Sequence, residues 1–138
     1  MYKEICVFVE NKPGKLSRVA ETLGKAGIDI LALEIANEGQ FGVLKILTAE
    51  PDRAKTILEE AGMTCAFNNV AVVEIPDHPG GLLRLAKALE KSGINVTDAY
   101  GCILERGKRA VFVVKGDQLE TIETAAAEAG LRVLEQLE

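Results

Sequence analysis

An internal duplication constrains this sequence more than any other feature. The segment Asn11-Lys12-Pro13-Gly14-Lys15-Leu16 returns at an offset of 66 as Asp77-His78-Pro79-Gly80-Gly81-Leu82. The same offset relates Gly27-Ile28-Asp29-Ile30 to Gly93-Ile94-Asn95-Val96. One register held over a turn, a helix and the start of a strand indicates two copies of a single structural unit.

Farther along the chain the offset changes. Gly39 corresponds to Gly107 at an offset of 68, so two residues were added between Ile30 and the strand that follows Gly107. An even insertion preserves the alternation of inward and outward side chains along a strand, whereas an odd one turns the strand over. The duplication is therefore structurally coherent over both copies.

Periodicity and turn residues predict the same order of elements in each copy. Alternation of Ile5, Val7 and Val9 predicts a strand, and apolar residues at helical spacing followed by Gly27 predict a capped helix. The elements predicted for the first copy are strand 5–9, helix 16–26, a hairpin of strands 28–36 and 41–48, helix 51–61 and strand 63–67. Those predicted for the second copy are strand 70–75, helix 82–92, strands 94–104 and 109–115, helix 119–129 and strand 131–136.

This order, β-α-β-β-α-β in each copy, is that of the ferredoxin-like fold. We therefore predict an α+β protein of two tandem domains, 1–68 and 69–138, with antiparallel sheets and helices on one face. Asn68-Asn69 is the expected linker. Domains of about 60 residues are marginally stable alone, so the two sheets are expected to pair side by side, and a symmetric homodimer is a further hypothesis.

Composition excludes several classes of protein. A net charge of -5 with 4% aromatic residues argues against nucleic-acid binding. No apolar run approaches the ~18–20 residues of a membrane span, and the N-terminus lacks the pattern of a signal peptide, so a cytoplasmic location is expected. Cys6, Cys65 and Cys102 lie far apart in apolar surroundings and are interpreted as core thiols, with no disulfide, metal site or cofactor expected.

The two Pro-Gly turns are the strongest candidates for a binding site. Each lies between a strand and the N-terminus of a helix, where unpaired backbone N–H groups and the helix dipole favour an anion such as a carboxylate. Gly14 and Gly80 allow a ligand to approach the backbone, and a side-chain oxygen of Asn11 or Asp77 can accept from an ammonium group. An α-amino acid carries both charges. A turn of this composition also simply begins a helix by capping it, and that alternative stays open.

The turns, each followed by a Leu-rich helix and then by Gly-Ile-Asp-Ile or Gly-Ile-Asn-Val, closely resemble the ACT domain, a regulatory module that binds small molecules. The resemblance covers both copies and implies a stand-alone tandem ACT protein without a catalytic domain. It implies that ACT domains pair side by side and hold ligands, usually amino acids, at their interfaces. There the turn of one domain faces the start of the second strand of its neighbour. The residues so nominated are Asn11, Lys12, Pro13, Gly14, Lys15, Leu16, Ile28, Asp29 and Ile30, and Asp77, His78, Pro79, Gly80, Gly81, Leu82, Ile94, Asn95 and Val96.

The two turns differ in charge. Lys12 and Lys15 place positive charge beside the first turn, whereas Asp77 in the second repels a carboxylate and attracts an amine. His78, the single histidine, either contacts a ligand or is a plain solvent-facing residue. One turn is therefore expected to bind while the other mainly supports the fold.

Two other functions compete with ligand binding. Ferredoxin-like folds also house small enzymes such as acylphosphatases. However, the sequence offers no nucleophile with a base and no metal-ligand spacing, so no catalytic residues are expected. An assembly module that recognises a partner protein without a ligand is the other alternative. The preferred hypothesis is a non-catalytic regulatory protein that binds an amino acid and signals to an enzyme partner.

Overall fold

A computed structural model describes residues 1–137, except the side chain of Glu38. The contacts divide the chain into two compact units. The N-terminal unit contains Lys3–Asn68 together with Leu137, and the C-terminal unit contains Asn69–Gln136 together with Met1 and Tyr2. Each unit has its own hydrophobic core.

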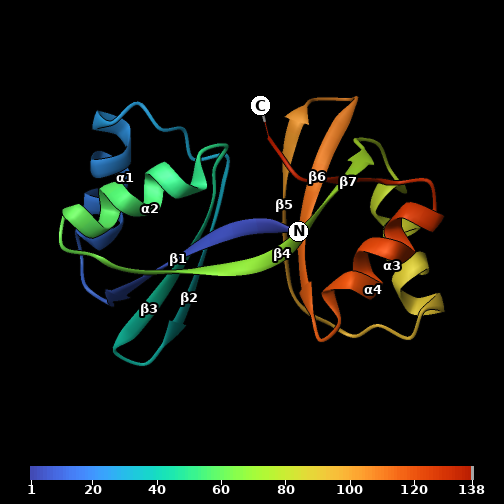
Figure 1. Cartoon of the computed structure of the whole chain (residues 1–138), viewed down its shortest axis with the longest axis horizontal. Coiled ribbons are helices and arrows are strands. Elements are labelled where there is room, and N and C mark those ends of the chain that lie inside the picture. Colours follow the sequence, from blue (N-terminus) through green and yellow to red (C-terminus); the bar gives the residue numbers. More distant parts are fainter. Residues whose placement is uncertain (138) are drawn as a thin grey trace. The chain divides into compact units, whose positions relative to one another are not determined.

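The N-terminal unit places two helices on one face of a sheet (Figure 1). Its strands lie in the order β2-β3-β1-β4, and β3 pairs antiparallel with both of its neighbours. Ile5 and Val7 of β1 join the core beneath the helices, while the alternate residues Cys6 and Phe8 face the other side of the sheet. The elements are β1 (Tyr2–Glu10), α1 (Lys15–Lys25), β2 (Ala32–Glu38), β3 (Phe41–Leu47), α2 (Pro51–Glu60) and the first part of β4 (Thr64–Pro76).

The C-terminal unit repeats this arrangement. Strand β4 pairs with β6 and β7, and β6 pairs with β5, all antiparallel, with helices α3 and α4 beside the sheet (Figure 1). Its further elements are α3 (Gly81–Lys91), β5 (Val96–Glu105), β6 (Arg109–Gly116), α4 (Leu119–Glu128) and β7 (Arg132–Leu134). The predicted class, an α+β chain of two ferredoxin-like units, is confirmed.

The two residues expected to link the copies belong to a strand and not to a loop. Asn68 and Asn69 lie inside β4, a single strand of 13 residues that ends the first copy and begins the second. Asn68 Nδ2 donates to the Cys6 Sγ atom at 2.9 Å and to Glu4 Oε1 at 3.4 Å. Two residues of the neighbouring strand β1 therefore hold its side chain. Asparagine usually disfavours strands, but these hydrogen bonds satisfy the amide within one. Within residues 1–137 the two copies therefore share seven strands where eight separate ones were expected.

The added residues of the second copy occupy two separate places. Ile103 pairs with Ala110 just as Asn37 pairs with Gly42, so the offset of 66 persists on the first strand of the hairpin as far as Ile103. One residue is then absorbed by an irregularity between Ile103 and Glu105, and the other lengthens the turn before Arg109. Because both lie at the end of the hairpin, the alternation along most of β5 is undisturbed.

Strands β2 and β5 begin later than predicted. Residues 28–31 precede β2, which starts at Ala32, and β5 starts at Val96. Ile28 and Ile94 instead donate their backbone N–H groups to the carbonyls of Leu23 and Leu89, both at 3.0 Å. These bonds close the C-terminal ends of α1 and α3 in the manner of a Schellman motif, which delays the strands. Likewise the final strand is shorter than the predicted 131–136.

An arginine at the same place in each copy joins the two helices of its unit. Arg18 of α1 donates to the carbonyl of Ala61, and Arg84 of α3 donates from Nε at 3.0 Å and from Nη2 at 2.6 Å to the carbonyl of Ala129. Both acceptors lie at helix C-termini, where carbonyls lack helical partners and a positive charge is favourable.

Substituting Arg84 by alanine is expected to destabilise the protein by about 1 kcal/mol, since two hydrogen bonds at an exposed helix end are lost. Urea unfolding measures the change. Lys87→Ala on the same helix serves as control, because Lys87 forms an exposed pair with Glu90. If Arg84→Ala lowers the free energy of unfolding no more than the control does, the Arg84 hydrogen bonds do not stabilise the contact between the helices.

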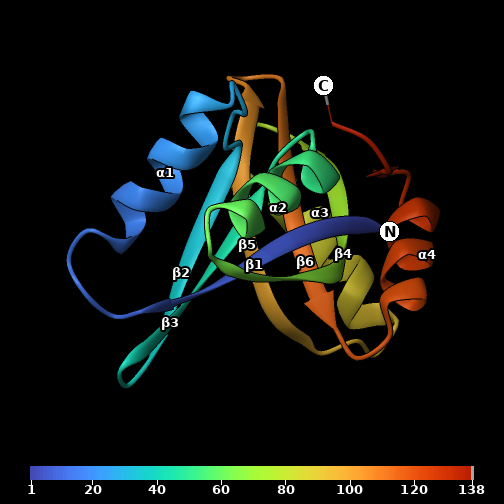
Figure 2. The same ribbon diagram turned by 60° about the vertical axis from the view of Figure 1, so that its left-hand side comes forward.

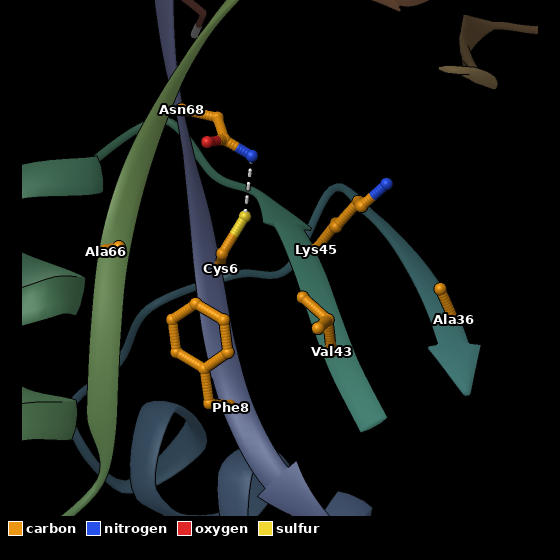
Figure 3. A pocket seen from close by; sticks show the side chains of 7 residues that line it. All are labelled: Cys6, Phe8, Ala36, Val43, Lys45, Ala66 and Asn68. Atoms are coloured by element: carbon orange, nitrogen blue, oxygen red, sulfur yellow. Dashed lines mark hydrogen bonds between the residues drawn. The ribbon is translucent and has the colours of Figure 1, made fainter. Parts of the chain in front are cut away.

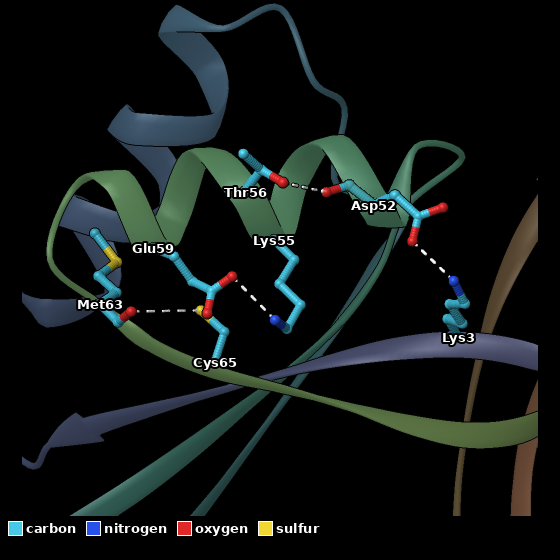
Figure 4. Close-up of polar contacts among 7 residues, drawn as sticks. All are labelled: Lys3, Asp52, Lys55, Thr56, Glu59, Met63 and Cys65. Carbon is cyan, nitrogen blue, oxygen red and sulfur yellow. Dashed lines mark hydrogen bonds and ion pairs between the residues drawn. The ribbon is translucent and has the colours of Figure 1, made fainter.

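Several polar contacts lie along α2, which packs over β1 and β4 (Figure 4). Lys3 Nζ lies 2.8 Å from Asp52 Oδ1, and Lys55 Nζ lies 2.9 Å from Glu59 Oε1. Near this pair, burial and the Glu59 carboxylate raise the pKa of the Cys65 thiol. Burial also raises the pKa of Cys102. In the described residues the three cysteines form no disulfide, and the two thiols with raised pKa are protonated and weakly nucleophilic at neutral pH.

Candidate functional site

Both Pro-Gly turns present an uncapped helix N-terminus. Gly14 and Gly80 precede α1 and α3 with φ of 89° and 90°, a left-handed conformation that glycine adopts without steric cost. Neither helix start receives a side-chain hydrogen bond. The backbone N–H groups of the first helical turn, such as those of Leu82 and Leu83, have no acceptor within the helix. Each turn therefore provides the donors and the positive dipole end that an anion requires.

Asn11 and Asp77 do not cap the helices. Asn11 Nδ2 donates to the Gly39 carbonyl at 3.5 Å, and Asp77 Oδ2 accepts from the Gly107 backbone N–H at 2.7 Å. In each unit the side chain thus ties the Pro-Gly turn to the turn of the following hairpin, β2–β3 or β5–β6. The backbone of the β2–β3 hairpin can be followed in Figure 2. The capping alternative raised by the sequence is wrong, since these residues position the turn and leave the helix end open.

The first turn carries less free positive charge than its sequence indicated. Lys12 Nζ lies 2.7 Å from Glu10 Oε2. The hydrogen bond and charge of Lys12, with a smaller contribution from Lys15, lower the pKa of Glu10, and Glu10 correspondingly raises the pKa of Lys12. The Glu10 carboxylate therefore offsets part of the attraction that Lys12 would exert on a bound anion.

The two turns share one backbone hydrogen bond, from the Lys12 N–H to the Glu10 carbonyl at 2.8 Å in the first, but differ where the helix begins. The His78 backbone N–H donates to the Pro76 carbonyl at 3.0 Å, and His78 Nδ1 lies 2.9 Å from the Pro79 carbonyl oxygen. A Cβ atom on Gly81 would lie 2.1 Å from that same Pro76 oxygen. Glycine is thus required at position 81 by close packing, whereas the first turn has Lys15 at the equivalent place.

A cavity of about 350 Å³ adjoins the second turn. It combines three residues nominated from the sequence, Asp77, His78 and Leu82, with the floor formed by β5 and β6. The full lining is Ile75, Pro76, Asp77, His78, Leu82, Gly101, Cys102, Ile103, Ala110 and Phe112. The uncapped N-terminus of α3 therefore opens beside a largely apolar recess.

The remaining nominated residues are distributed differently. Ile28 is buried in the N-terminal core and Ile30 packs against it. Ile94 and Val96 line a second cavity of the C-terminal unit, of about 380 Å³, together with Leu82. Leu82 is thus the residue that links the second turn to the nominated strand start. Asp29 and Asn95 follow the glycines that end α1 and α3, and neither lines a cavity described for these units.

Sequence reasoning missed the floor of the turn cavity. Ile75, Gly101, Ile103 and Phe112 line it without belonging to the turn. One signal was present in the sequence, because Gly101 occupies the position that Ile35 holds in the first copy. A glycine replacing a β-branched residue in a predicted strand indicates a close approach or an opening there.

A third cavity, of about 320 Å³, lies on the sheet face of the N-terminal unit away from its helices (Figure 3). Its lining includes Cys6 and Phe8 of β1, Lys45 of β3 and Asn68 of β4. The Asn68 amide points toward the Cys6 thiol, as Figure 3 shows. None of the residues nominated from the sequence lines this cavity.

Within residues 1–137, no cluster of three or more His, Cys, Asp or Glu side chains is placed to hold a metal ion. Over the same residues, the helices are all too short or too polar to cross a membrane.

Comparison with known proteins gives a clear family. The family model described as an ACT domain pair matches residues 1–136. Protein BT0572 from Bacteroides thetaiotaomicron has a similar structure, with a TM-score of 0.86, 26% identity and coverage of 96% of this chain and 91% of that one. The ligand-free regulatory subunit of aspartate kinase from Thermus thermophilus shares the fold, with a TM-score of 0.66, 16% identity and coverage of 92% and 91%. The comparison with curated proteins gives no match. By its matching family model, this chain belongs to the ACT domain pair family.

Proposed function

We propose that this protein is a non-catalytic regulator that binds an amino acid at the second Pro-Gly turn. The observation that supports the proposal most directly is the cavity of about 350 Å³ that opens beside the uncapped N-terminus of α3. Membership of the ACT domain pair family supports a regulatory role, and the resemblance described above supports an amino acid as the ligand.

In this proposal, the turn offers a complementary group to each charge of such a ligand. The α-carboxylate accepts hydrogen bonds from the N–H groups at the start of α3, where Gly80 has no side chain to exclude it. The α-ammonium lies toward Asp77, whose Oδ2 also accepts from the Gly107 backbone N–H. The side chain of the ligand then extends over the cavity floor.

A thermal-shift panel of the standard amino acids tests the proposal, followed by calorimetry for each amino acid that raises the Tm. A ligand present at 100 times its Kd stabilises the native state by about 2.7 kcal/mol, which gives a readily measured shift. Absence of a shift with every amino acid would refute amino-acid binding and favour the assembly module.

The two turns are predicted to contribute unequally. Gly80→Ala and Gly14→Ala each place a Cβ at a left-handed position, with a cost of about 1–2 kcal/mol in stability. Only Gly80→Ala is expected to weaken amino-acid binding, by about tenfold, because the added methyl group distorts the turn that faces the cavity. Calorimetry on both variants below their unfolding temperatures measures the difference. Equal losses of affinity would contradict a preference for the second turn.

We further propose a cytoplasmic homodimer in which a neighbouring ACT domain closes the site and the bound state is transmitted to an enzyme partner. Small units such as these gain stability by association. Light scattering coupled to gel filtration measures the assembly, and a monomer at micromolar concentration would overturn the dimer.

A further inference from the structure

Two cavities of the C-terminal unit share a wall. Leu82 of α3 and Phe112 of β6 line both the cavity of about 350 Å³ beside the turn and the cavity of about 380 Å³ farther along α3. The two cavities therefore follow one another between α3 and β5, beginning at the second turn, and the Phe112 ring lies where they meet. We call this space, lined by Leu82, Ala99, Gly101, Ile103 and Phe112, the α3–β5 groove.

The position of Phe112 depends on Gly101. These residues are cross-strand partners, and a Cβ on Gly101 would lie 3.1 Å from Phe112 Cζ and 3.1 Å from the Val111 carbonyl oxygen. The ring thus lies over the glycine in the space that a side chain at 101 would occupy. This contact places an aromatic face on the floor of the turn cavity.

The first copy fills the equivalent space with side chains. Its counterpart to the Gly101–Phe112 pair is Ile35–Leu44, and its counterpart to Ala99 is Leu33, which packs against the N-terminal core. The two copies therefore have the same backbone arrangement but different floors. On β5, Gly101 leaves room that the Phe112 ring occupies, whereas the first copy has Ile35 and Leu44 at that place, and Ala99 is smaller than its counterpart Leu33.

The polarity of the α3–β5 groove changes along its length. Asp77 and His78 lie at the turn end, and the residues that follow beside them are apolar, including Leu82, Ile103 and Phe112, with Glu90 as the charged residue of the farther cavity. A ligand that fits must have charged groups at one end and an apolar body at the other. A volume of about 350 Å³ lies within the ~300–1,000 Å³ range of small-molecule sites.

We infer that the second unit selects an amino acid with a large apolar side chain, which lies in the α3–β5 groove against Leu82 and Phe112. The inference rests on the proposed function and adds the class of side chain and the residues that select it. Each buried methylene strengthens binding by about fourfold, so leucine is expected to bind about fiftyfold more tightly than alanine. Aspartate and lysine bind more weakly still, because an apolar floor does not solvate their charge.

Calorimetry on the full chain with leucine, methionine, phenylalanine, alanine, serine, aspartate and lysine measures this preference. The decisive variant is Gly101→Ile/Phe112→Leu, which installs the residue pair that the first copy already accommodates as Ile35–Leu44. It is expected to reduce the preference for leucine over alanine by about tenfold or more, through loss of the aromatic wall and filling of the floor. Ile35→Ala on β2 is the matched control and is expected to leave the preference unchanged.

Thermal unfolding first establishes that each variant is folded at the temperature of titration. Should Gly101→Ile/Phe112→Leu be unfolded, Ala99→Leu replaces it, since this substitution fills the groove from a neighbouring floor position. Equal binding of leucine and alanine by the unaltered chain, or an unaltered preference in the folded variant, would overturn the inference and leave the proposed function standing. Binding of no amino acid at all would instead overturn the proposed function itself.

Discussion

Substituting Gly81 by lysine is expected to destabilise the C-terminal unit by about 3 kcal/mol, although lysine is the residue at the equivalent position 15 of the first copy. The cause is steric. A Cβ at position 81 would lie 2.1 Å from the Pro76 carbonyl oxygen and 3.3 Å from its carbonyl carbon. That oxygen also accepts the His78 N–H at 3.0 Å, and the first turn keeps the same bond beside Lys15, from the Lys12 N–H to the Glu10 carbonyl at 2.8 Å, so the second turn would have to shift to admit a Cβ.

Gly81→Ala separates packing from the effects of a long charged side chain. Alanine favours a helix over glycine by about 1 kcal/mol, so propensity alone predicts that Gly81→Ala stabilises α3. The short contact predicts the opposite sign. Urea unfolding followed by circular dichroism measures both variants, and Lys15→Gly is the reciprocal control, expected to cost no more than about 1 kcal/mol. A stabilised Gly81→Ala protein would contradict the steric explanation.

The duplication made the fold predictable from sequence. Two copies of the same periodicity reinforce each other, so the helices at 15–25 and 81–91 follow from apolar spacing and from the glycines that end them. The order of elements then fixes the ferredoxin-like arrangement. The starts of β2 and β5 were less predictable. Ile28 and Ile94 have strand-forming side chains, but their backbone N–H groups donate to carbonyls at the ends of α1 and α3.

Asn68 shows why the linker was misjudged. Asparagine favours turns in general. Asn68 is accommodated in a strand because it donates to Cys6 and Glu4 on the neighbouring strand, which lie more than 60 residues away in sequence. The same limit applies to Asn11 and Asp77. Their acceptor and donor, Gly39 and Gly107, lie on hairpin turns that become neighbours only after folding.

The candidate site was predictable in part. Local sequence identified the turns because proline, glycine and a helix start are adjacent there. The cavity floor depends on which side chain of β6 covers Gly101, and this follows from strand register, which the sequence indicates only through differences between the copies. Two positions at which the copies differ, Leu33 against Ala99 and Ile35 against Gly101, therefore say more about the cavity floor than the shared turn residues do.

A second large effect is expected in the N-terminal core, where Leu58→Ala should cost about 3 kcal/mol. Leu58 is fully buried on α2, and its removal leaves a cavity among Ile5, Leu23 and other members of the core. Urea unfolding measures the loss. Glu60→Ala, an exposed change on the same helix, is the control and is expected to remain within about 0.5 kcal/mol of the unaltered protein.

The second copy indicates how far this loss can be repaired. Helix α4 has Ile122 and Ala126 where α2 has Ala54 and Leu58, and all four are fully buried, so large and small residues exchange places one helical turn apart. Ala54→Ile in the Leu58→Ala background therefore restores some buried volume. Recovery should be less than half, because Ile122 depends on Gly116, whose Cβ would lie 3.0 Å from Ile122 Cδ1, and the first copy has the buried Thr48 at that place. Full recovery in Ala54→Ile/Leu58→Ala would show that Thr48 leaves room for isoleucine and that the glycine at 116 is not what admits Ile122.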